Sequence, residues 1–68
     1  KSELPNLTER ELEVLSLICN EYSGPEIAKQ INVSFGTVEK HRANLMIKSG
    51  SKNTAGLVRW ALENNLVQ

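Results

Sequence analysis

The sequence is poor in the residues that build disulfides, metal sites and membrane spans. Cys19 is the single cysteine and His41 the single histidine, so the chain has no disulfide framework and no ligand set for a structural metal site. No run approaches the roughly 20 apolar residues that cross a bilayer. No charged-then-apolar secretory signal opens the chain. We therefore predict a cytoplasmic protein without metal, other cofactors or membrane contact.

Patterns typical of enzymes are also lacking. There is no paired-carboxylate cleft, no glycine-rich phosphate loop, and no nucleophile with a base at a recognisable spacing. We expect neither catalysis nor a small-molecule ligand in this domain. The 68 residues suffice for one small domain with a modest core, so we predict a single domain over residues 1–68. Because the chain starts at Lys1 and not at a methionine, we expect it to be part of a longer protein.

The net charge of zero conceals a gradient along the chain. Residues 1–34 hold three Lys or Arg against six Glu, a net charge of −3, whereas residues 35–68 hold five against two, a net charge of +3. This asymmetry is more informative than the overall balance, because it predicts that the second half carries any surface that binds an anionic partner.

Helix boundaries are well marked, whereas no segment shows strand alternation for long and aromatic residues make up only 4% of the chain. Thr8 and Ser23 each begin a capping box that is completed by a glutamate three residues later. Ser34 is placed to cap a third helix, and Gly50 to end it. We predict an all-α fold of four helices, at about residues 9–21, 24–31, 35–49 and 54–64.

The second and third predicted helices have the spacing of a helix-turn-helix. Ala28 is small enough for the helices to approach, Asn32 tolerates the left-handed conformation of a turn, and Val38 is a β-branched residue that packs into the angle. The second helix of such a pair can place its N-terminal half in a DNA major groove. The spacing alone also fits a plain three-helix bundle, and the charge gradient favours the nucleic-acid interpretation.

Three segments, "LTERELEVLSLI", "EIAKQINVSFGTVEKHRANLMIKSG" and "LVRWALENNLV", closely resemble the C-terminal DNA-binding domain of the LuxR/NarL/FixJ family of bacterial transcription regulators. The resemblance runs from about Leu7 to Val67. It implies a four-helix domain that contains a helix-turn-helix, with a third helix that binds the major groove and a fourth that forms a homodimer contact. It also implies that the domain is the C-terminal part of a regulator controlled by a receiver or ligand-binding domain.

The resemblance places the base-reading residues in the exposed half of the third helix, at Glu39, Lys40 and Ala43, with Arg42 nearby. Lys40 can donate to guanine O6 and N7, and Glu39 can accept from cytosine N4. For Glu39, an interaction with the helix dipole or with a neighbouring side chain is an equally open alternative. Any single lysine can also belong simply to a solvated face.

Other contacts follow from the same resemblance. The candidate phosphate-binding residues are Ser34, Thr37, Lys48, Lys52 and Asn53, with Arg42 as a further candidate. The candidate dimer residues on the fourth helix are Val58, Arg59 and Leu62. The expected partners are double-stranded DNA and a second copy of the chain, and RNA polymerase is left open as a third.

The chain departs from the family pattern at several positions. Gly24-Pro25 replaces the usual Asn-Lys, so we expect a phosphate contact from the second helix to be lost. Ile47 stands where the family often has a basic residue, and its helical angle predicts exposure. The net charge of zero and the missing lysine of the second helix leave open a protein-interaction module that has kept the fold and lost DNA binding. Region four of a sigma factor is another alternative, since it shares E-I-A and S-x-G-T-V. It has no equivalent of "LVRWALENNLV", so that segment favours the LuxR-type domain.

Overall fold

The computed structural model describes residues 6–67 and forms four helices over that range, with no strand among them. The helices are α1 (Glu9–Cys19), α2 (Gly24–Ile31), α3 (Phe35–Ser49) and α4 (Thr54–Glu63). The predicted all-α fold is therefore confirmed. The predicted domain of residues 1–68 also includes residues 1–5 and 68, which lie outside the described residues. None of the four helices is long and apolar enough to cross a bilayer.

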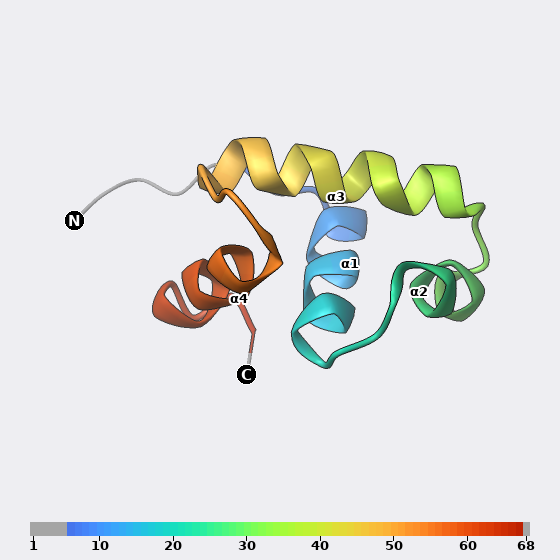
Figure 1. The fold of residues 1–68 in the computed structure, drawn as a ribbon, viewed down its shortest axis with the longest axis horizontal. Coiled ribbons are helices and arrows are strands. Elements are labelled where there is room, and N and C mark those ends of the chain that lie inside the picture. The colour runs from blue at the N-terminus through green and yellow to red at the C-terminus, as the bar shows by residue number, and fades with distance from the viewer. Residues whose placement is uncertain (1–5, 68) are drawn as a thin grey trace.

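The longest helix, α3, forms one side of the molecule (Figure 1). Helices α2 and α4 lie towards its opposite ends, and α1 lies between them. All three contact α3, and α1 also contacts both α2 and α4. The four helices therefore share one core, to which α3 contributes a single face.

The core is made of aliphatic side chains from all four helices. Val38 and Leu45 are fully buried on the inner face of α3. They pack in one cluster with buried side chains of the other helices: Val14, Leu15, Ile18, Ile27, Ala28, Leu57 and Ala61. Each large aliphatic side chain buried in this way contributes about 1.5–3 kcal/mol.

Every described helix begins with a side-chain cap whose oxygen accepts a hydrogen bond from the amide three residues later. The four capping residues are Thr8, Ser23, Ser34 and Asn53. At Thr8 and Ser23 the glutamate three residues on also accepts from the capping residue's amide, which confirms both predicted capping boxes. These bonds satisfy amides that a helix start otherwise leaves without a partner.

Every described helix also ends in the same way, with a left-handed residue followed by an amide that donates to the carbonyl five residues earlier. The left-handed residues are Glu21, Asn32, Gly50 and Asn65. The closing bonds are 2.9–3.2 Å long and run from Tyr22 to Leu17, Val33 to Ala28, Ser51 to Met46, and Leu66 to Ala61. This is the Schellman arrangement, which supplies partners for carbonyls at a helix end.

These helix ends correct two predicted boundaries. The first helix was expected to reach residue 21, but α1 ends at Cys19, because Glu21 adopts a left-handed φ of 70°. Glutamate rarely takes this conformation, so the residue at position 21 did not indicate a helix end. Helix α4 ends at Glu63, one residue earlier than predicted, because Asn64 has left the helical conformation. The predicted bounds of α2 and α3 are confirmed.

The helix-turn-helix is present as predicted. Asn32 ends α2 with φ 61° and ψ 50°, and only residues 32–34 separate α2 from α3. Ala28 is 9% exposed and Val38 is fully buried, so both occupy the angle between the helices. The turn places the N-terminal end of α3 beside α2, at the end of the molecule away from α4 (Figure 1).

The inner face of α3 provides a direct test of this packing. Leu45→Ala removes a fully buried side chain and should lower the free energy of unfolding by about 2–5 kcal/mol. Ile47→Ala on the same helix removes a side chain that is 78% exposed and should change it by less than about 0.5 kcal/mol. Urea denaturation followed by circular dichroism measures both. Equal losses in the two variants would contradict the described packing.

Candidate nucleic-acid interface

Three of the four predicted base-reading side chains, Glu39, Lys40 and Ala43, are exposed on α3. At 100° per residue they fall within an arc of about 100° on the side opposite Val38 and Leu45. The buried pair holds α3 on the core, and the opposite arc faces outward. This arc offers an acceptor, a cationic donor and a small methyl group to an approaching molecule.

The carboxylate of Glu39 lies beside the start of α2. Its Oε2 atom is 3.4 Å from the point where a Cβ atom on Gly24 would lie. Within residues 6–67 the recorded ion pairs join other side chains, and Glu39 takes part in none. It also follows the first turn of α3, which holds no acidic residue. Its position thus leaves the carboxylate at the surface.

Arg42, the fourth predicted base-reading residue, is only partly exposed, and its guanidinium donates a hydrogen bond to Thr54 Oγ1. Thr54 is the first residue of α4, so this bond joins α3 to the start of α4. The structure therefore places Arg42 between two helices and separates it from the exposed arc that holds Lys40.

The start of α3 brings together two predicted phosphate-binding residues. Ser34 Oγ accepts from the Thr37 amide at 3.1 Å, and the two side-chain oxygens lie 2.9 Å apart at hydrogen-bonding distance. Ser34 is exposed and Thr37 is partly exposed. Amides at the start of a helix, together with its dipole, favour an anion in this position.

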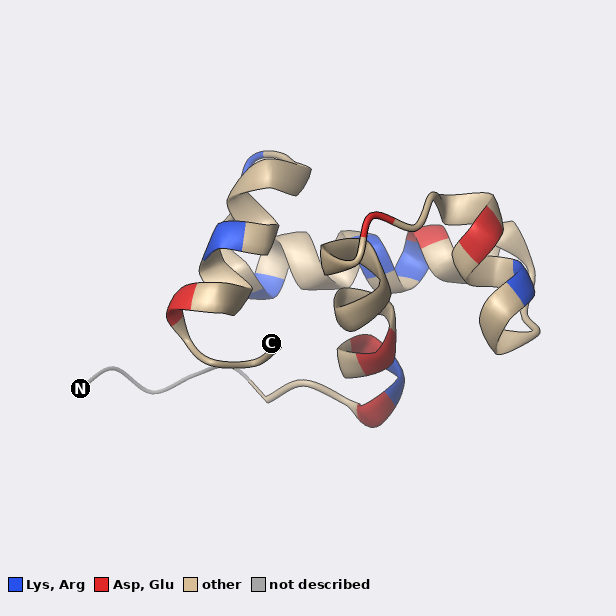
Figure 2. Cartoon of the chain, turned by 90° about the horizontal axis from the view of Figure 1, so that it is seen from below, with Lys and Arg blue, Asp and Glu red and all other residues tan. Residues whose placement is uncertain are grey.

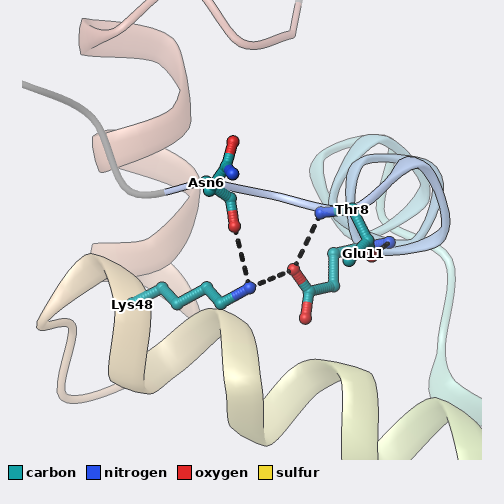
Figure 3. A network of polar contacts seen from close by, with 4 residues as sticks. All are labelled: Asn6, Thr8, Glu11 and Lys48. Atoms are coloured by element: carbon teal, nitrogen blue, oxygen red, sulfur yellow. Dashed lines mark hydrogen bonds and ion pairs between the residues drawn. The ribbon is translucent and has the colours of Figure 1, made fainter.

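Lys48, a third predicted phosphate-binding residue, is engaged inside the domain (Figure 3). Its Nζ atom lies 2.7 Å from Glu11 Oε1 and donates to the Asn6 carbonyl at 2.9 Å. The Thr8 amide donates to the same Glu11 oxygen at 3.1 Å. Sequence reasoning identified Glu11 only as part of a capping box. Its second role depends on a residue 37 positions away.

Glu11 is 3% exposed and is the only buried charged residue within residues 6–67. The hydrogen bond from Lys48 is the largest influence on its carboxyl and lowers its pKa. Burial opposes that effect, and the Thr8 amide adds to it, so the pKa is lowered overall. Lys48 therefore stabilises a buried negative charge that ties α1 to the C-terminal part of α3.

The two remaining phosphate candidates lie in the loop between α3 and α4. Lys52 is exposed. Asn53 uses its Oδ1 atom to accept from the Gly56 amide at 2.8 Å, which caps α4. Asn53 therefore has a structural task, and its side-chain amide group is the part left to contact another molecule.

The predicted dimer residues share one side of α4. Leu62 is 51% exposed, Arg59 is exposed, and Val58 is partly buried against the core. Arg59 Nε pairs with Glu63 Oε2 at 3.1 Å one turn later. The outer part of this face thus combines an apolar side chain with an exposed ion pair.

The charge gradient of the sequence becomes a spatial separation. Figure 2 shows most Lys and Arg positions on α3, α4 and the loop between them, whereas most Glu positions lie on α1, α2 and the loop between those helices. An anionic partner would therefore be drawn to the side formed by α3 and α4.

Sequence reasoning assigned no role to Phe35. It is the first residue of α3 and is 51% exposed. Gly24 was considered only because it replaces a polar residue of the family pattern, with the expected loss of a phosphate contact. The structure brings these two residues into contact. The signal in the sequence was the single phenylalanine of a chain that has few aromatic residues.

Comparison with a family described as "Bacterial regulatory proteins, luxR family" matches residues 5–61. Among curated proteins, the chain is 44% identical over 62 residues to "Probable transcriptional regulator ycf29" of Cyanophora paradoxa and to "Oxygen regulatory protein NreC" of Staphylococcus aureus. Each match covers 91% of this chain. The chain spans about three-tenths of the length of these relatives, 30% and 29% respectively.

Two solved structures of related sequence superpose closely on this chain. The transcription factor GerE superposes with a TM-score of 0.85 at 29% identity, covering 91% of this chain and 92% of GerE. VqmA of Vibrio cholerae, described as a dimer and in connection with LuxR-type receptors, superposes with a TM-score of 0.88 at 34% identity. That match covers 93% of this chain and 29% of VqmA.

The Glu11–Lys48 pair predicts a specific dependence of stability on pH. Because the pKa of Glu11 is lowered in the folded state, its stabilisation is complete above the unfolded-state pKa of about 4.3 and is lost as the pH falls through the folded-state pKa. Lys48→Met leaves the buried carboxylate without its cation. At pH 7 this should cost about 2–3 kcal/mol, and the difference from the unsubstituted chain should shrink below about pH 4.

Urea denaturation between pH 3 and pH 7 measures this difference. Arg10→Met is the matched control, because its pair with Glu13 is exposed and should contribute at most about 1 kcal/mol. A Lys48→Met penalty that stays constant across this pH range would contradict the role given to the pair.

Proposed function

This chain belongs to the luxR family of bacterial regulatory proteins, and on that premise we propose that it binds double-stranded DNA sequence-specifically as the output domain of a longer transcription regulator. The regulator acts in the cytoplasm, and a receiver or ligand-binding domain controls it. The domain has no catalytic step. The observation that carries this proposal is the outer side of α3, where Glu39, Lys40 and Ala43 are exposed on the second helix of the helix-turn-helix.

Helix α3 enters the major groove with its outer arc against the base edges. Lys40 donates to O6 and N7 of a guanine, and Glu39 accepts from N4 of a cytosine. Ala43 adds little bulk, so the helix can approach closely. Glu39 also rejects bases that present an acceptor in its position, so the carboxylate contributes to specificity although it weakens the attraction to phosphate.

Phosphate contacts orient the domain on the duplex without carrying sequence information. Ser34, Thr37 and the amides at the start of α3 hold one phosphate. Lys52 and the side-chain amide of Asn53, in the loop after α3, contact a second phosphate of the DNA backbone. Arg42 contributes positive charge to this side while it remains bonded to Thr54, whereas the charge of Lys48 is balanced by Glu11.

The domain acts as a homodimer that joins two α4 helices through Val58, Arg59 and Leu62. The exposed apolar area of Leu62 supports this arrangement. Two copies of α3 then address half-sites about one helical turn of DNA apart. RNA polymerase is a further partner of the DNA-bound regulator.

Duplex binding should depend on salt through the phosphates that the basic side neutralises. Each neutralised phosphate contributes about −0.9 to the slope of log K against log salt concentration. We expect a slope of about −3 to −5 for a labelled random duplex, measured by fluorescence anisotropy at several salt concentrations. No binding at the lowest salt, either by this chain or by a form dimerised through a fused coiled coil, would support the interaction-module alternative.

Base recognition should depend on Lys40 beyond its charge. On a duplex selected from a random library, Lys40→Ala should cost about 1–3 kcal/mol and relax the preference at one guanine. Lys29→Ala is the matched control, because it removes the same charge from an exposed position on α2. The same loss in both variants would reduce the role of Lys40 to general electrostatic attraction. Glu39→Gln should relax the preference at a cytosine in the same experiment.

A further inference from the structure

Phe35 is the one large aromatic side chain exposed on α3, and it occupies the first residue of that helix. Single exposed apolar side chains are common on protein surfaces, so exposure alone assigns no role. The position is informative, because the N-terminal residues of the second helix in a helix-turn-helix contact base edges. A half-exposed aromatic ring therefore stands at the end of α3 that enters the groove.

Gly24 determines where this ring lies. A Cβ atom on Gly24 would come within 2.5 Å of Phe35 Cε1 and 3.3 Å of Phe35 Cδ1. The ring therefore occupies the space that any other side chain at position 24 would need. The ring lies against the first residue of α2.

The same place receives the carboxylate of Glu39. Glu39 Oε2 lies 3.4 Å from the position of that Cβ atom, so ring and carboxylate converge on Gly24. Phe35 and Glu39 are four residues apart and neighbours on one side of α3. Gly24 thus makes room for an apolar surface directly beside an acceptor, and about half of the Phe35 side chain stays open to solvent.

The major groove offers chemistry that matches this pair. Thymine presents a C5 methyl group, for which phenylalanine is a suitable apolar contact, and cytosine presents an amino donor for a carboxylate. Four residues along a helix span about 6 Å, or about two base-pair steps. We propose that Phe35, held in place by Gly24, contacts the C5 methyl of a thymine one or two base pairs from the cytosine addressed by Glu39. This inference rests on the proposed DNA binding of the domain.

A library of random duplexes prepared with either thymine or uracil tests the proposal, because uracil lacks only the C5 methyl. Duplexes bound by this chain are sequenced from both libraries. We expect a thymine preference at one position of each half-site, and about fourfold weaker binding when uracil replaces thymine there, as the loss of one methyl contact predicts. Positions elsewhere in the site should tolerate uracil.

Three variants assign the effect to this ring. Phe35→Ala should abolish the difference between thymine and uracil and keep the guanine preference of Lys40, whereas Phe35→Leu should retain part of the difference. Gly24→Ala fills the space under the ring and should reduce the difference by displacing it. Ile47→Ala is the matched control, because it removes an exposed apolar side chain from the same helix and should leave the difference unchanged.

Equal binding of thymine and uracil at every position would overturn the proposal, and so would a difference that persists in Phe35→Ala. If random duplexes still bind with the expected salt dependence in that case, the inference fails and the proposed function stands. If neither library is bound at any salt concentration, both fail. If Phe35 serves only to cover the start of α2, thymine and uracil should bind equally at every position.

Discussion

The burial of one face of α3 is the constraint on which the rest of this domain depends. Val38 and Leu45 are fully buried there, and each of the other helices packs against α3. In so small a domain only about 60% of the unfolded surface becomes buried, so few side chains carry the stability. The same packing decides which face of α3 stays outside. Core and candidate interface are therefore two sides of one helix, and the position of the second follows from the first.

A chain without net charge can have a basic side when its charges are distributed unevenly over its helices. Lys48 is bonded to a buried glutamate and Arg42 to the start of α4, so two cations of the basic half hold helices together. Lys40 and Lys52 lie exposed. Most glutamates lie on α1, α2 and the loop between them (Figure 2). The separation of charge in space matters more here than its sum.

The helices were predictable because residues close to each end determine where most of them begin and end. Serine, threonine and asparagine before each helix point to a cap, and asparagine or glycine after α2 and α3 points to a left-handed stop. These signals act over a few residues, so they do not depend on how the helices pack together. The end of α1 was wrong because Glu21, a residue without this preference, takes the left-handed conformation. There the hydrogen bond from the Tyr22 amide to the Leu17 carbonyl closes the helix around the left-handed residue.

Local patterns were thus enough to establish four helices, the helix-turn-helix and the family resemblance, since each depends on residues close together in the chain. The exposed positions of Glu39, Lys40 and Ala43 also followed, because helical periodicity sets them relative to the core. Tertiary structure alone decided that Lys48 meets Glu11 and that the ring of Phe35 rests on Gly24. Such partners come from different helices. Which side chains meet depends on how the helices pack, and no spacing within one helix contains that information.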